Sequence, residues 1–231
     1  MPRSSTPLAL SVVSMTEPGD IQKTFERITE FDNRQFGFNH NQTWTAMPLA
    51  LKGVLKADRV AGTFSKAPKR VQDCIVALCR LGEENPLQTF KFKDFPAAGI
   101  RTRQSIEWDP TVTIRVMGSC WYVADETAII PLLQPRKAPL SELRLAVYQY
   151  LATKAYCNGD WSAAQTALID LSGDGPVTAR YIDLHSLPQV SERDVREFVE
   201  TFVQAKQMAD QARRLREKPL TPLPMGELLD I

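Results

Sequence analysis

The segment Trp121–Lys137, WYVADETAIIPLLQPRK, contains the pattern that decides the fold. Two apolar runs flank the polar residues Asp125–Thr127, and the second run, AIIPLLQ, is continuous. Such a run is typical of a strand covered on both faces, whereas Pro131 lacks a ladder donor and indicates an edge strand or a bulge. The segment therefore predicts a β-hairpin whose second strand ends at Gln134–Lys137.

The elements around this hairpin follow from hydrophobic periodicity. Alternation in 111–117 predicts a strand, and Cys120–Ala124 continues it or begins the next. Apolar residues at helical spacing predict a helix that opens at Pro139 and Ser141 and ends near 158–160; its apolar stripe is Leu143, Ala146, Val147, Tyr150 and Leu151. Two further strands are predicted in TALIDLS and TARYIDLHSL, and then a long helix behind a Ser191/Asp194 capping box, buried through Phe198 and Phe202.

The N-terminal residues predict helices rather than strands. Helices are expected over 20–31 and 70–85, with Gly82 close to the end of the second. Residues 32–44 predict a loop, and 47–62 a weak helix. The chain thus divides into a mainly helical part (1–100), a core (101–216) and a Pro-rich tail (217–231). We expect an α/β fold, with a mixed sheet flanked by helices.

Composition limits the classes of function. With 43% apolar and 24% charged residues, the chain is composed like a globular protein, and no run approaches the ~20 apolar residues of a membrane span. We expect no signal peptide and no membrane partner. The four cysteines lack zinc-site spacing, and the apolar helical run around Cys74 and Cys79 predicts that these two are buried free thiols. We therefore expect a reducing, cytoplasmic environment. No nucleotide-cradling glycine motif occurs, so no small-molecule cofactor is expected.

Basic residues gather in the first half of the chain. Residues 1–105 hold 15 basic and 10 acidic side chains, against 13 and 17 in 106–231. The best candidates for contact with phosphates or an acidic partner are Lys66, Lys69, Arg70, Lys91 and Lys93. An ordinary solvated surface is the alternative reading of both clusters. His40, in an Asn-rich stretch, is expected to be solvated.

The hairpin, the helix after it and the next strand resemble the core of the PD-(D/E)XK (restriction-endonuclease-like) nuclease superfamily, in its recombination and CRISPR-associated branch. The matching parts are Met117–Ser119, the strand Ala128–Gln134, and the helix carrying Tyr148 and Gln149. This resemblance implies a metal-binding Asp soon after the glycine. It also implies an acidic residue and a Lys two positions apart at the end of the second strand.

The residues at those positions differ from the family's pattern. Cys120 and Trp121 follow the glycine, and Gln134 and Arg136 replace the acid and the lysine. A neutral amide is a weak Mg²⁺ ligand, an arginine does not act as a base, and Lys137 is one residue late. We expect no metal site. Mg²⁺ would be needed only if acidic residues at other positions act as its ligands. The weak catalytic candidates are Asp109, Asp125, Glu126, Gln134 and Lys137.

The sequence thus favours a non-catalytic protein with a nuclease-like fold that binds nucleic acid or a nucleoprotein complex. Arg136 and Lys137 could hold phosphates at the end of the strand, where charged side chains must reach solvent. One alternative is an assembly or adaptor protein acting through its C-terminal helix and tail. Another is an active metal-dependent nuclease with displaced acids.

Overall fold

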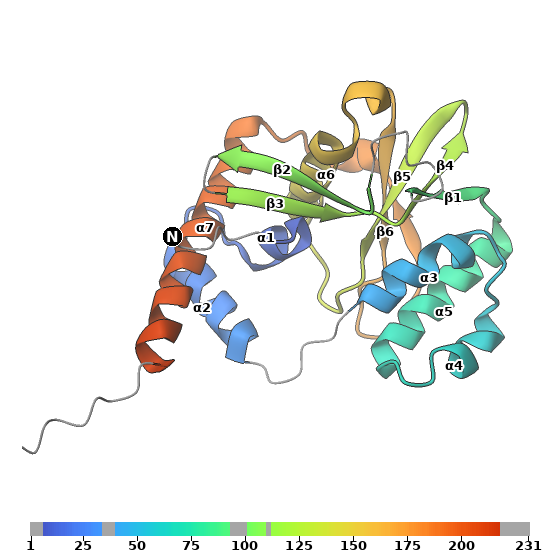
Figure 1. Cartoon of the computed structure of the whole chain (residues 1–231), viewed down its shortest axis with the longest axis horizontal. Coiled ribbons are helices and arrows are strands. Elements are labelled where there is room, and N and C mark those ends of the chain that lie inside the picture. Colours follow the sequence, from blue (N-terminus) through green and yellow to red (C-terminus); the bar gives the residue numbers. More distant parts are fainter. Residues whose placement is uncertain (1–6, 34–39, 93–100, 110–111, 218–231) are drawn as a thin grey trace, which may run out of the picture.

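The computed structural model describes residues 7–33, 40–92, 101–109 and 112–217. Its centre is a five-stranded sheet of order β1-β4-β5-β6-β7, in which β5 and β6 are parallel and every other neighbouring pair is antiparallel. The strands are Thr89–Lys91 (β1), Cys120–Ala124 (β4), Thr127–Gln134 (β5), Gln165–Asp170 (β6) and Arg180–Ile182 (β7). Helices flank this sheet (Figure 1). The predicted α/β class, with a mixed sheet flanked by helices, is confirmed.

A second, two-stranded sheet pairs β2 with β3, and it was not expected as a separate sheet. Its strands are Arg103–Asp109 (β2) and Val112–Met117 (β3). The helices are α1 (Ala9–Met15), α2 (Ile21–Asn33), α3 (Asn41–Leu51), η1 (Ala57–Arg59), α4 (Val60–Thr63), α5 (Lys69–Glu84), α6 (Glu142–Tyr156), η4 (Gly159–Trp161), η5 (Leu184–Ser186) and α7 (Glu192–Glu217).

Strand β5 lies in the middle of the sheet, so the edge position indicated by Pro131 is wrong. The ladder between β4 and β5 extends only as far as the pair Tyr122 and Ile129. Pro131 lies beyond that pair, where β5 forms no hydrogen bond with β4, so the missing N–H of the proline costs no bond there. On its other side Pro131 aligns with Ala167 of the parallel strand β6. Coverage on both faces is confirmed, because Leu132 and Leu133 belong to two different hydrophobic clusters.

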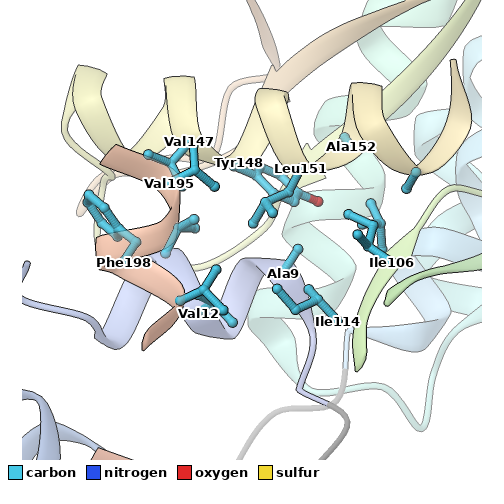
Figure 2. Packing of buried hydrophobic residues seen from close by; sticks show 14 of the residues in the cluster. Ala9, Val12, Ile106, Ile114, Val147, Tyr148, Leu151, Ala152, Val195 and Phe198 are labelled. Atoms are coloured by element: carbon cyan, nitrogen blue, oxygen red, sulfur yellow. The ribbon is translucent and has the colours of Figure 1, made fainter. Parts of the chain in front are cut away.

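Each face of the sheet carries its own hydrophobic cluster. The larger one joins α1, α6, α7 and the β2–β3 hairpin; Figure 2 shows Val12 of α1 near Phe198 of α7, with Val147 of α6 beside them. The smaller one packs α3 and α5 against the other face, through residues that include Leu133 and Ile169. The division of the chain at residue 100 stays a prediction.

The weak helix over 47–62 is wrong in its bounds. Helix α3 begins at Asn41, inside the expected loop, and ends where Gly53 adopts a φ of +68°, a conformation that glycine adopts most readily. Gly82 does not end α5 but lets α3 approach it. A Cβ on Gly82 would lie 2.0 Å from the backbone oxygen of Ala50.

The predicted helix caps of α6 and α7 are confirmed. Ser141 accepts a hydrogen bond from the Arg144 backbone, and Ser191 and Asp194 exchange hydrogen bonds as a capping box. In α7, Phe198 and Phe202 are buried as expected. The stripe of α6 is partly wrong, since Leu143 is 42% exposed. Within the described residues, no helix is long and apolar enough to span a bilayer.

Candidate functional site at the carboxyl ends of the central strands

Strands β5 and β6 end together, because they are parallel and Gln134 aligns with Asp170. The chain then runs from Pro135 towards α6 through a loop that reaches between α1 and α2 on one side and α3 and α5 on the other (Figure 1). Loops at the carboxyl ends of parallel strands are the usual place for ligand sites in open α/β sheets. This is also where the resemblance places the acid and the lysine of the nuclease family.

Gln134 shapes this loop from inside the protein. Its side chain is fully buried and does not reach solvent. The amide nitrogen donates to the Ala138 carbonyl at 2.8 Å, and the amide oxygen accepts from the Arg136 backbone at 3.1 Å. A neutral amide with both polar atoms bonded can be buried at low cost, whereas a charged end group cannot.

Arg136 is half-buried beneath α1. Its guanidinium donates to the hydroxyls of Ser14 and Ser11, the latter at 3.1 Å, and lies 5.9 Å from the ring centre of Phe31. Burial lowers the pKa of Arg136. Within the described parts of the chain no carboxylate pairs with this guanidinium, which therefore keeps an uncompensated positive charge.

Arg70 of α5 approaches the same loop from the opposite side. Its guanidinium donates to the Leu171 carbonyl and, at 3.5 Å, to the Arg136 carbonyl. These partners are neutral, and in the part of the chain that the structure covers Arg70 likewise forms no ion pair. Arg70 therefore brings a second uncompensated charge to the loop.

His40 completes the group and corrects the expectation that it is solvated. It precedes α3 and is partly buried. Burial, together with the positive charges of Arg136 and Arg70, lowers the pKa of His40 from 6.5 to about 4. The imidazole is therefore neutral at pH 7. We call Arg70, Arg136 and His40 the cationic cluster.

A buried carboxylate lies nearby but is already engaged. Asp170, at the end of β6, accepts hydrogen bonds from the Ser172 backbone at 3.0 Å and the Ser172 hydroxyl at 2.9 Å. It also pairs with Arg180 at 2.8 Å. Asp170, His40 and the two serines of α1 were not among the residues predicted for a site. The Ser-x-x-Ser spacing, which places both hydroxyls on one helix face, was the only available signal.

The other basic candidates lie away from the cationic cluster or have partners. Lys69 is exposed and pairs with Asp73 at 2.7 Å, and exposed Lys137 pairs with Asp174 at 3.0 Å. Lys66 is exposed. Of the remaining two, Lys91 lies on β1 and lines a groove, and Lys93 lies outside the described residues.

The acidic candidates are not brought to the cluster. Asp125 and Glu126 form the tight turn between β4 and β5, with φ of 46° and 61°. This turn is at the opposite end of β5 from Gln134, about 25 Å away at ~3.3 Å per residue. Asp109 ends β2 in the other sheet. Among the described side chains, no three His, Cys, Asp or Glu groups converge as metal ligands would.

No family model matches this chain, and no curated protein matches it. The chemistry of the site must therefore be read from its residues. Two guanidinium groups without a carboxylate, beside hydroxyls and an imidazole, form a set of hydrogen-bond donors suited to an oxyanion.

Proposed function

We propose that this protein binds the phosphate backbone of nucleic acid through Arg70 and Arg136, without a metal ion and without cleaving it. The observation that carries the proposal is the uncompensated charge of the cationic cluster. A desolvated guanidinium that has only neutral partners is costly, and an incoming phosphate would relieve that cost with charge-assisted hydrogen bonds.

The topology supports a nuclease-like origin for this site. The antiparallel hairpin β4–β5, the crossover helix α6 and the parallel strand β6 follow one another in the order on which the resemblance to the PD-(D/E)XK nucleases rests. Gln134 and Arg136 occupy the positions of the family's acid and lysine. Binding without catalysis follows if the strand ends keep their contact with phosphate while losing the groups that hold Mg²⁺.

Salt-dependent binding tests the proposal. Fluorescence anisotropy with a DNA duplex should give a Kd that rises steeply with salt, because each neutralised phosphate releases counterions. Replacing both arginines with glutamine should lower the slope of log K against log salt by about 1.8, at ~0.9 per phosphate contact. Lys69→Gln is the matched control, since Lys69 is adjacent to Arg70 but exposed and paired with Asp73.

Two results would overturn the proposal. One is wild-type protein that binds neither DNA nor RNA at low salt. The other is an Arg70→Gln/Arg136→Gln variant whose affinity and salt slope match those of the wild type. Cleavage of plasmid or single-stranded DNA with Mg²⁺ or Mn²⁺, abolished by Asp125→Ala, would instead favour the displaced-acid nuclease.

An assembly or adaptor role is the second candidate. It is favoured by apolar side chains on the C-terminal half of α7, where Met208 is 41% exposed and Leu215 is 65% exposed. Exposed apolar residues on one helix can mark a protein contact. This role predicts a partner that is lost on Met208→Ser/Leu215→Ser and kept on Arg70→Gln/Arg136→Gln.

A further inference from the structure

A groove of about 430 Å³ opens beside the start of α3. Helix α3 supplies one wall with Asn41, Trp44 and Thr45, and the strands supply the other with Lys91 and Arg103. This volume falls within the range of roughly 300–1,000 Å³ that is usual for small-molecule sites.

The wall of the groove is positively charged. Among the described residues that line it are two cations, Lys91 of β1 and Arg103 of β2, and no acidic side chain. Neither cation forms an ion pair within the described ranges. The hydroxyls of Ser119 and Thr45 and the amide of Asn41 add polar groups between them. Such a lining complements an anion that also carries hydrogen-bonding groups.

The rest of the lining is apolar. Trp44 is only 6% exposed, so it serves as a wall and not as a projecting side chain, and Pro48 and Met117 continue this surface. A flat aromatic ring could lie against these residues while its polar edge met Asn41. The combination of two cations, an amide and an apolar wall is that of a site for a heteroaromatic group joined to a phosphate.

The groove and the cationic cluster share the start of α3. His40 belongs to the cluster, and Asn41, the next residue, lines the groove. The first turn of α3 therefore lies between the Arg70/Arg136 pair and the Lys91/Arg103 pair.

We propose that this groove takes one unpaired nucleotide of a single strand, with its phosphate on Lys91 and Arg103 and its base against the Trp44 wall. The inference rests on the proposed function and narrows it to single-stranded nucleic acid. A base pair is wider than a single nucleotide and is stacked on both sides, so a duplex could contact only the cluster. Single strands should therefore gain one phosphate contact that a duplex lacks.

The test uses the full chain and three probes of equal length: an oligothymidylate, an oligouridylate and a DNA duplex. The Lys91→Gln/Arg103→Gln variant should weaken binding of the single strands about tenfold and lower their salt slope by about 0.7, the value for one phosphate contact. Duplex binding should change less than twofold. Lys91→Arg/Arg103→Lys should restore single-strand affinity. Arg193→Gln/Arg214→Gln, at two exposed positions on α7, is the control of equal charge.

The outcomes separate the two proposals. If wild-type protein binds none of the three probes, the proposed function itself fails. If it binds them all and the Lys91/Arg103 variant weakens none, or weakens the duplex equally, the groove inference is wrong while the function stands. Should the double variant melt early, Arg103→Gln alone, at an exposed position, must show the same selective loss. Equal loss with both single strands would indicate that the 2′-hydroxyl is not read.

Discussion

Two arginines contact α1 or its C-terminal end, but they differ in whether a carboxylate of the described residues pairs with them. Arg144 of α6 donates to the carbonyls of Ser14 and Thr16, at 2.9 and 2.6 Å, and pairs with Glu17 at 3.2 Å. Arg136 contacts the hydroxyls of Ser14 and Ser11 and has no carboxylate within the described residues. Burial lowers the pKa of both guanidinium groups.

The difference indicates what each arginine does. Arg144 pairs with a carboxylate and donates to two carbonyls, and these bonds fix the C-terminal end of α1 to α6. Among the described residues no such acid pairs with Arg136, although Arg136 contacts the same helix. Arg144 is stabilised by groups of its own protein, whereas the role proposed above for Arg136 is to meet an anion from outside.

The largest expected effect concerns the support beneath both arginines. Phe198 packs in the cluster that also contains Val12 of α1 (Figure 2). Phe198→Ala should lower the free energy of unfolding by roughly 3–5 kcal/mol, because it leaves a cavity in a close-packed core. Urea denaturation measures this, with Met208→Ala on the exposed side of α7 as the control. A Phe198→Ala variant that melts within a degree of wild type would show that α7 packs elsewhere.

Arg144→Ala should destabilise the protein by about 2 kcal/mol, since it removes charge-assisted hydrogen bonds from a largely buried group. Glu17 would keep Arg27, which lies 2.7 Å from it, so the loss should be moderate. The control is Arg196→Ala, whose ion pair with Glu192 is exposed and should contribute under ~0.5 kcal/mol. Equal melting of the two variants would remove the distinction between the arginines.

Gln134→Glu restores the acid that the resemblance leads one to expect, and it should lower stability by about 1–2 kcal/mol at pH 7. The amide nitrogen donates to the carbonyls of Ala138 and Arg136, and a carboxylate oxygen in its place would face both as an acceptor. Thermal melting measures the loss, with exposed Gln204→Glu as the control. An unchanged or raised Tm would show that the loop can still hold an acid.

The hairpin and the elements after it could be predicted because their signals are local. Alternation in β3, the Ser141 cap of α6 and the capping box of α7 each depend on residues a few positions apart. The centre of the sheet could not be predicted from Pro131, since what matters is where the ladder of β4 stops. That depends on the pairing of two strands and not on the proline.

The cationic cluster lay beyond prediction for a similar reason. Arg70 and Arg136 were both candidates, but 66 positions separate them in the chain, and only the packing of α5 against the sheet brings them together. His40 carried no local signal of burial. Lys69 and Arg70 are neighbours in sequence, yet one is exposed with its own acid and the other turns towards the loop.

The pH dependence of stability tests whether burial and the charges of Arg136 and Arg70 lower the pKa of His40. Its folded pKa of about 4 is lower than its unfolded value of 6.5, so folding favours the neutral form. Stability from this residue is complete above pH 6.5 and is lost as the pH falls towards 4, an effect of about 1 kcal/mol after allowance for its partial exposure. His40→Gln should reduce this loss.

Anion binding should act on His40 in the opposite direction. A phosphate beside Arg70 and Arg136 offsets their charge and raises the pKa of the imidazole. With only two histidines in the chain, NMR can follow each ring during a titration with an oligonucleotide. A His40 that titrates near 6.5 in the free protein, or at the same pH with and without the oligonucleotide, would contradict the cluster.

Arg136→Ala is expected to change stability least, and it distinguishes the roles of Arg136 and Arg144 most clearly. Arg136→Ala removes two hydrogen bonds to hydroxyls and a contact with the Phe31 ring, but it also removes a poorly solvated charge and its repulsion with Arg70. These terms oppose each other, so unfolding should shift by less than about 1 kcal/mol. Nucleic-acid affinity should nevertheless fall.

Arg144→Ala should do the reverse, lowering stability while leaving the affinity of the remaining folded protein near that of wild type. If Arg136→Ala instead destabilises as much as Arg144→Ala and leaves binding unchanged, then Arg136 is only a structural clamp on α1, and the absence of a carboxylate partner says nothing about an external anion.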